Sequence, residues 1–249
     1  MSAVAEVSLG AVDHTLLVAT TRQRDERPGT LFNGDRANAI DYAEITVSIP
    51  PTHKQGQIEW PTTPPGDPNA DFVVRKEDYL DGDKAFMQAL NAQLALRPPG
   101  KRRVFLFIHG FNTMFAEGLY RLAQIAHDAN APGVPVLFTW ASRGKATAYL
   151  YDSNSATSAR DELEHTLRLL LSSNAEQVNV LAHSMGNWVT VEAFRQIKDG
   201  EHDGVVRRGQ VEPDDVGRLG GEFGTVADAP GLVSREVDLV RAQGKRQTY

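Results

Sequence analysis

The sequence predicts an α/β fold: a three-layer, mostly parallel sheet that is incomplete at its C-terminal edge. From Val104 onward, short apolar runs alternate with runs at helical spacing, in the order strand, helix, strand, helix, strand, helix. That order favours a right-handed parallel sheet with helices on both faces. After Lys198 the pattern stops, and residues 200–249 hold nine of the 21 glycines and no isoleucine.

Composition excludes several classes of function. The 249 residues are 41% hydrophobic, which is enough for one large α/β domain. A formal net charge of −6 gives no support for nucleic-acid binding. The absence of cysteine excludes disulfides, thiol catalysis and cysteine-rich zinc sites. The start has no signal-like apolar region and no run reaches transmembrane length, so we expect a cytoplasmic protein without an integral membrane segment.

We expect two unequal parts. Residues 1–199 should form the folded domain, with N-terminal strands and a proline-rich segment in 1–100 and the core in 101–199. Residues 200–249 should be irregular; if they add no strand, the strand at 178–182 becomes an exposed sheet edge. Before the core, the pattern predicts a strand at 15–21, a polar loop at 22–38, a half-buried strand at 42–49, an extended proline-rich segment at 50–68, a brief strand at 72–75 and a helix at 83–96 capped by Asp83.

The core elements follow from the same patterns. The continuous apolar run at 104–108 is typical of a parallel strand covered on both faces. The remaining expected elements are strands at 134–138 and 178–182, helices at 115–129, 155–172 and 187–197, and a short amphipathic helix at 232–240.

The sharpest motif joins the strand at 178–182 to the helix at 187–197. Only His183, Ser184, Met185 and Gly186 make the turn, so a serine at its apex would present an exposed hydroxyl. This is the nucleophile elbow, usually written Gly-x-Ser-x-Gly, with the small residue Ala182 at its first position. The alternative is a serine that only caps the following helix.

A second motif, His109-Gly110-Phe111-Asn112, follows the strand at 104–108. A sharp turn at Gly110 would aim the Phe111 N–H at a developing oxyanion, with the Met185 N–H as the second donor. His109 is expected to be a structural hydrogen-bonding residue rather than the base. The alternative is a plain strand-to-helix turn with glycine at positive φ.

Other polar positions suggest a substrate rim and no cofactor. Trp140 and Arg143 follow the strand at 134–138, at the edge where open α/β sheets bind ligands. Arg143 could contact an acidic substrate or could equally pair with a surface carboxylate. Tyr149, Tyr151 and Asp152 could line the same rim, and Asp152 could equally cap the following helix. The remaining histidines show no metal-ligand spacing, with His127 and His165 expected on solvated helix faces. No metal and no cofactor is predicted, because the chain also lacks a glycine-rich phosphate loop.

With both motifs placed, the chain resembles the α/β-hydrolases. More narrowly, it resembles a bacterial esterase/lipase-like branch catalogued as alpha/beta hydrolase of unknown function. The resemblance covers residues 14–199 and implies a three-layer α/β-hydrolase-like sheet and a Ser–His–acid hydrolase with Ser184 as nucleophile. It rests on Val18-Ala-Thr-Thr-Arg22, Val47-Ser-Ile-Pro-Pro51, Phe107-Ile-His-Gly-Phe-Asn112, Val136-Leu-Phe-Thr-Trp140, Ser142-Arg-Gly144, Tyr151-Asp152 and Leu181-Ala-His-Ser-Met-Gly-Asn187.

The departure from this family lies after the elbow. In such hydrolases the acid and then the histidine follow the nucleophile in the chain. Here His202 is the only later histidine, and a helix of about 11 residues carries it roughly 16 Å away. Asp214 follows no apolar strand. A truncated or frame-shifted coding end would explain this composition.

Two hypotheses follow. The first is a serine hydrolase acting on small-molecule carboxylic esters. The alternative is a catalytically inactive binding module that lacks its triad histidine and acid. The sequence leaves the substrate and the oligomeric state open.

Overall fold

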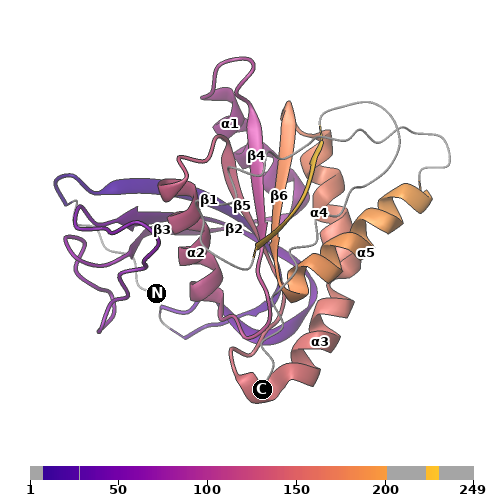
Figure 1. The fold of residues 1–249 in the computed structure, drawn as a ribbon, viewed down its shortest axis with the longest axis horizontal. Helices are drawn as coiled ribbons and strands as arrows, with labels where there is room; N and C mark the ends of the chain where they lie inside the picture. The colour runs from indigo at the N-terminus through magenta and orange to yellow at the C-terminus, as the bar shows by residue number, and fades with distance from the viewer. Residues whose placement is uncertain (1–7, 28, 201–222, 230–249) are drawn as a thin grey trace, which may run out of the picture.

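The computed structural model describes residues 8–27, 29–200 and 223–229. One seven-stranded sheet runs in the order β3-β2-β1-β5-β4-β6-β7, with helices on both of its faces (Figure 1). The strands are β1 Val12–Arg24, β2 Phe32–Ile49, β3 Val73–Leu80, β4 Arg103–Ile108, β5 Val134–Thr139, β6 Gln177–His183 and β7 Phe223–Ala229. The helices are α1 Gly82–Ala95, α2 Phe115–Asp128, α3 Tyr149–Ser158, α4 Arg160–Ser172 and α5 Met185–Gly200, with a short 3₁₀ turn η1 at Ala146–Ala148.

The four central strands β1, β5, β4 and β6 are parallel, which confirms the predicted α/β sheet. Antiparallel strands flank them, β2 and β3 on one side and β7 on the other. Because strand ends in a parallel sheet meet at one edge, the turns after β4, β5 and β6 lie together.

The expectation of an uncovered edge at β6 is wrong, since β7 pairs with it from Val178↔Ala229 to His183↔Phe223. The segment Phe223–Ala229 was missed because it contains glycine and aspartate and no continuous apolar run. An outer strand needs fewer apolar residues than a central one. The helix expected at 232–240 lies outside the described residues.

Two apolar layers fill the space between sheet and helices. Helices α1, α4 and α5 cover one face through residues such as Leu90, Leu167 and Val189. Helix α2 covers the other face with Leu119 and Leu122. Alternate β4 residues enter the two layers, as predicted for a strand covered on both sides.

Three local expectations need correction. The loop expected at 22–38 is mostly strand: β1 and β2 form a long hairpin whose outer part pairs through backbone despite its polar residues, as in Arg24↔Phe32. The helix expected at 155–172 is two helices that meet at Ala159. The N-cap of α1 is Asp81 and not the expected Asp83. Asp83 lies in the first turn, where it accepts a hydrogen bond from the Tyr42 hydroxyl at 2.8 Å.

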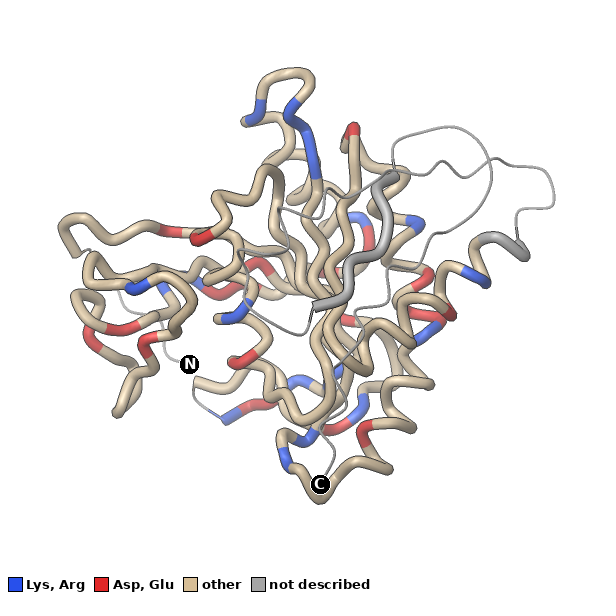
Figure 2. Tube along the Cα trace, in the orientation of Figure 1, with Lys and Arg blue, Asp and Glu red and all other residues tan. Residues whose placement is uncertain are grey.

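Charge is dispersed along the described chain. In Figure 2 acidic and basic positions are interspersed over both the sheet and the helices. None of the helices among the described residues is long and apolar enough to cross a membrane.

Candidate active site

The turn between β6 and α5 consists of a single residue, Ser184. Its side chain is exposed, and its backbone lies in the left-handed region with φ of 50°. A non-glycine residue in that region costs on the order of 1 kcal/mol or more and is found preferentially at functional sites. The strand therefore ends in a strained corner with a serine at its apex.

Glycines let this corner touch the turn after β4. A Cβ on Gly110 would lie 2.7 Å from His183 Nδ1 and 3.0 Å from Ser184 Cβ. A Cβ on Gly186 would lie 2.5 Å from the His109 carbonyl oxygen. Each glycine therefore has a neighbour closer than 3.0 Å to where a Cβ would lie, so the two turns can pack this closely only with glycine at both positions.

The left-handed residue of the β4 turn is Asn112, with φ of 57°, and not Gly110. Asparagine tolerates this conformation better than most residues. Glycine is needed at position 110 because the elbow residues His183 and Ser184 leave no room for a side chain. On the other side of the serine, the Asn187 amide, oriented to satisfy both its atoms, donates to the Ala182 carbonyl at 3.1 Å and accepts from the Ser184 N–H at 3.3 Å.

His109 lies beneath the two turns and is almost fully buried. Its Nδ1 donates to the Gly110 carbonyl at 2.8 Å, because a carbonyl can only accept, and its Nε2 is 2.8 Å from Thr139 Oγ1. Burial, followed by the nearby positive charge of Arg22, lowers the pKa of His109 to about 3. The imidazole is therefore a neutral structural group.

Trp140 and Arg143 differ from the expected substrate rim. The indole of Trp140 is completely buried, stacks on His109 with ring centroids 4.8 Å apart and donates to the His109 carbonyl; it cannot line a rim. Arg143 donates to Asp35 at 2.9 Å and lies over the Tyr151 ring, so its guanidinium is exposed at this edge but already paired.

Arg22, for which no role was predicted from the sequence, is completely enclosed below the site. Its guanidinium donates to Thr139 Oγ1 at 2.8 Å and to the carbonyls of Ser142 and Thr113 at 2.9 and 2.7 Å. Its Nη2 lies 3.4 Å from His109 Nε2. One side chain thus joins the end of β1 to the turns after β4 and β5.

Asp152 performs the matching acceptor role. Its fully buried carboxylate accepts from the N–H groups of Asn112 and Arg143 at 3.1 and 3.0 Å, and from the Ser142 hydroxyl at 2.6 Å. It therefore anchors two loops rather than capping a helix. Burial lowers the pKa of Arg22 to about 9, although the Asp152 charge opposes that shift, so the arginine stays charged at neutral pH.

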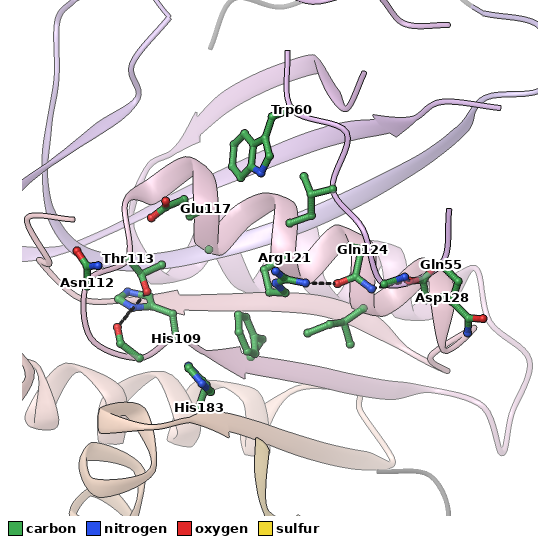
Figure 3. Close-up of a pocket in the computed structure, with 16 residues that line it drawn as sticks. Gln55, Trp60, His109, Asn112, Thr113, Glu117, Arg121, Gln124, Asp128 and His183 are labelled. Atoms are coloured by element: carbon green, nitrogen blue, oxygen red, sulfur yellow. Dashed lines mark hydrogen bonds between the residues drawn. The ribbon is translucent and has the colours of Figure 1, made fainter. Parts of the chain in front are cut away.

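A groove of about 800 Å³ begins at this corner. Gly110, Asn112 and His183 line one end, and the groove then follows α2 to Gln55 and Asp128 (Figure 3). Apolar side chains contribute to its wall, among them Phe107, Ile125, Ile58 and Trp60.

Within the described residues, the structure brings the two predicted turns together. Ser184, Met185 and Gly186 lie beside His109, Gly110 and Phe111 through the β4–β6 pairing. The two candidates for base and acid, His202 and Asp214, lie outside the described residues.

A mostly parallel sheet with helices on both faces and a serine in a sharp strand-to-helix turn is the arrangement of the α/β-hydrolases. A family model described as an alpha/beta hydrolase of unknown function matches residues 83–213, and the chain belongs to this family. Neither the curated proteins nor the solved structures include a match. The family assignment confirms the superfamily that the sequence motifs resemble.

Proposed function

We propose that this protein is a serine hydrolase that cleaves small-molecule carboxylic esters, with Ser184 as nucleophile. The observation that carries this proposal is the exposed Ser184 at φ of 50°, alone between β6 and α5. Strain of this kind is costly and is retained where it positions a reacting group.

The neighbouring backbone supports an oxyanion hole. Met185 is the first residue of α5. Its N–H therefore has no acceptor within the helix and lies at the positive end of the helix dipole. Phe111 follows Gly110, whose Cα packs against Ser184. In the proposed reaction, the Ser184 oxygen attacks the ester carbonyl and the N–H groups of Phe111 and Met185 stabilise the oxyanion. Such a donor is typically worth about 100- to 1000-fold in rate.

The mechanism also needs a histidine base. It would take the Ser184 proton, pass it to the leaving alcohol and later deprotonate the water that releases the acyl group. His109 does not suit this role, because it is buried and its pKa lies at about 3. The imidazole of His165 is paired with Asp83. Neither of these two histidines therefore serves as the base, and this observation motivates the second candidate, an inactive chain that binds a ligand at the same corner.

The groove supports an ester with an apolar acyl part. Phe107 and Ile125 lie along its wall together with polar residues, which include Asn112, Glu117 and His183, the residue before the proposed nucleophile. Such a mixed lining is typical of small-molecule sites.

A fluorophosphonate probe, which forms a covalent bond with an activated serine, separates the two candidates. We expect labelling of the folded wild type that disappears in Ser184→Ala. Ser158→Ala is the matched control, because that exposed serine lies on α3 and its hydroxyl bonds only the Asn154 carbonyl; this variant should label like wild type. Folded wild type that fails to react would exclude the hydrolase and favour the binding module.

A further inference from the structure

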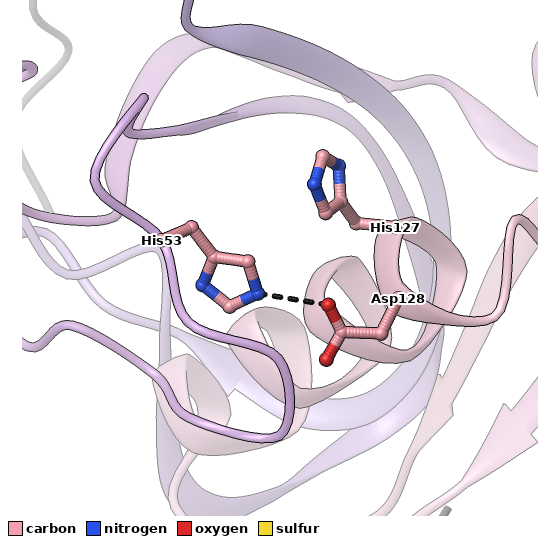
Figure 4. A group of neighbouring side chains, drawn as sticks. All are labelled: His53, His127 and Asp128. Carbon is pink, nitrogen blue, oxygen red and sulfur yellow. Dashed lines mark hydrogen bonds and ion pairs between the residues drawn. The ribbon is translucent and has the colours of Figure 1, made fainter. Parts of the chain in front are cut away.

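The other end of α2 carries a cluster of titratable side chains from three distant segments. His53 and Glu59 come from the proline-rich segment between β2 and β3, and His127 and Asp128 from the last turn of α2. His14 comes from β1. Figure 4 shows His53 directed at Asp128, with His127 beside them.

His53 is held between two carboxylates. Its Nδ1 lies 2.7 Å from Glu59 Oε2 and its Nε2 lies 2.8 Å from Asp128 Oδ1. The His53 and Asp128 side chains are only 7% and 5% exposed. One nitrogen or oxygen from each of His53, His127 and Asp128 lies within 4.8 Å of the others.

His127 completes this arrangement and is not on the solvated face expected from the sequence. Its Nδ1 lies 3.1 Å from His14 Nε2, and its ring meets that of His53 edge to face, with centroids 5.4 Å apart. The contact with His14 occupies Nδ1 and leaves Nε2 as the nitrogen available to the cluster.

We propose that His53, His127 and Asp128 bind one divalent transition-metal ion of the zinc class. Two imidazole nitrogens and one carboxylate oxygen form a donor set that suits zinc and its neighbours. Ligand atoms around a tetrahedral zinc lie about 3.3 Å apart, so small side-chain rotations bring these three groups onto one ion. This inference does not depend on Ser184.

Binding exchanges one proton for the ion. The proton between His53 Nε2 and Asp128 Oδ1 leaves to solvent, and the freed lone pair coordinates the metal. Nδ1–H continues to donate to Glu59, which fixes the ring in the carboxylate–histidine–metal arrangement common at zinc sites. The second oxygen of Asp128 is already oriented by the Gly56 N–H at 2.6 Å and by Gln124.

The site would fasten the proline-rich segment to the core. Between β2 and β3 that segment forms turns but no helix or strand, and the ion would join positions 75 residues apart. Asp128 also lines the groove, so solvent reaches the ion and a water can occupy its fourth position.

The test uses untagged full-length protein freed of metal by a chelator. Calorimetry with Zn²⁺ should give one ion per chain, and the melting temperature should rise with Zn²⁺ concentration, since the ion binds only the folded arrangement. Co²⁺ should give the visible ligand-field bands of a four-coordinate site. His127→Gln and Asp128→Asn should each abolish one-to-one binding, and Glu59→Gln should weaken it by about 10- to 100-fold.

His165→Gln is the control, because His165 is a half-exposed helical histidine that also pairs with a carboxylate, Asp83; it should bind like wild type. Circular dichroism checks that each variant is folded, and His127→Gln decides alone if Asp128→Asn does not fold. Wild type without saturable binding would overturn the proposal. Unchanged affinity in folded His127→Gln would do the same.

Discussion

The two ends of helix α2 lie at two polar sites that are built in different ways. At the Phe115 end, the turn after β4 meets Ser184 through backbone atoms, glycines and a left-handed residue. At the Asp128 end, imidazoles and carboxylates from distant segments meet through their side chains.

The two sites should respond differently to substitution of their residues. A site made of backbone depends on the packing that holds its turns, so substitutions beneath it should destabilise the whole fold. A site made of side chains can be removed one ligand at a time while the fold remains. Variants of Arg22, Gly186 and His109 test this expectation for the elbow, and the metal titration tests it for the histidine cluster.

The largest effect is expected at Arg22. Replacing it with leucine removes the donor shared by the turns after β4 and β5 and leaves their buried acceptors unpaired. It also removes the positive charge that faces the buried Asp152 carboxylate. Breaking buried ionic networks of this kind costs about 3–5 kcal/mol. Urea denaturation would measure the loss.

Arg24→Leu is the matched control, because Arg24 is on the same strand but pairs with Asp41 at the surface. We expect it to cost about 1 kcal/mol or less. Equal losses in the two variants would mean that the network under the elbow does not hold the site.

A smaller effect is expected at Gly186. A Cβ there would lie 2.5 Å from the His109 carbonyl oxygen, so Gly186→Ala should force the two turns apart and cost about 1–3 kcal/mol. Gly118→Ala offers the opposite case on α2, where the new methyl meets only Leu137 and His109 side-chain atoms at 3.7 Å or more.

Inside a helix, alanine is favoured over glycine by about 0.5–1 kcal/mol, so Gly118→Ala should be neutral or stabilising. Thermal denaturation compares the two variants directly. A stable Gly186→Ala protein would show that the backbone contact at the elbow can relax.

The same contrast explains what could be predicted from the sequence. The sheet and the elbow were visible because a buried strand and a strand-to-helix turn are local patterns, as at 104–108 and at Ser184. Gly110 and Gly186 were recognised for the same reason. A site formed by backbone turns depends on residues that are adjacent in the sequence, so a local pattern can reveal it.

The histidine cluster leaves no such pattern. His53 and Asp128 are 75 positions apart, and only the packing of the proline-rich segment on α2 brings them together. Arg22 was assigned to a polar loop, although it belongs to β1, because the β1–β2 hairpin continues into polar sequence. Strand β7 was missed because its few apolar residues do not predict a strand by themselves, and it forms a strand by pairing with β6.

The effect that is smallest at neutral pH, and grows only on acidification, is a pH dependence carried by His109. Its pKa in the fold, about 3, lies below the value of about 6.5 in an unfolded chain. As pH falls below 6.5, the unfolded chain binds a proton that the folded chain refuses, so stability falls until pH reaches about 3. One such group contributes a slope of roughly 1 kcal/mol per pH unit.

His109→Gln removes this group, so its free energy of unfolding should fall less steeply between pH 6.5 and 4 than that of wild type, whatever its absolute stability. Measuring urea midpoints across that range compares the two proteins. If His109→Gln kept the full slope, the imidazole under the elbow would be taking up a proton in the folded state. The turn after β4 would then contain a titratable group, like the imidazoles and carboxylates at the Asp128 end of α2.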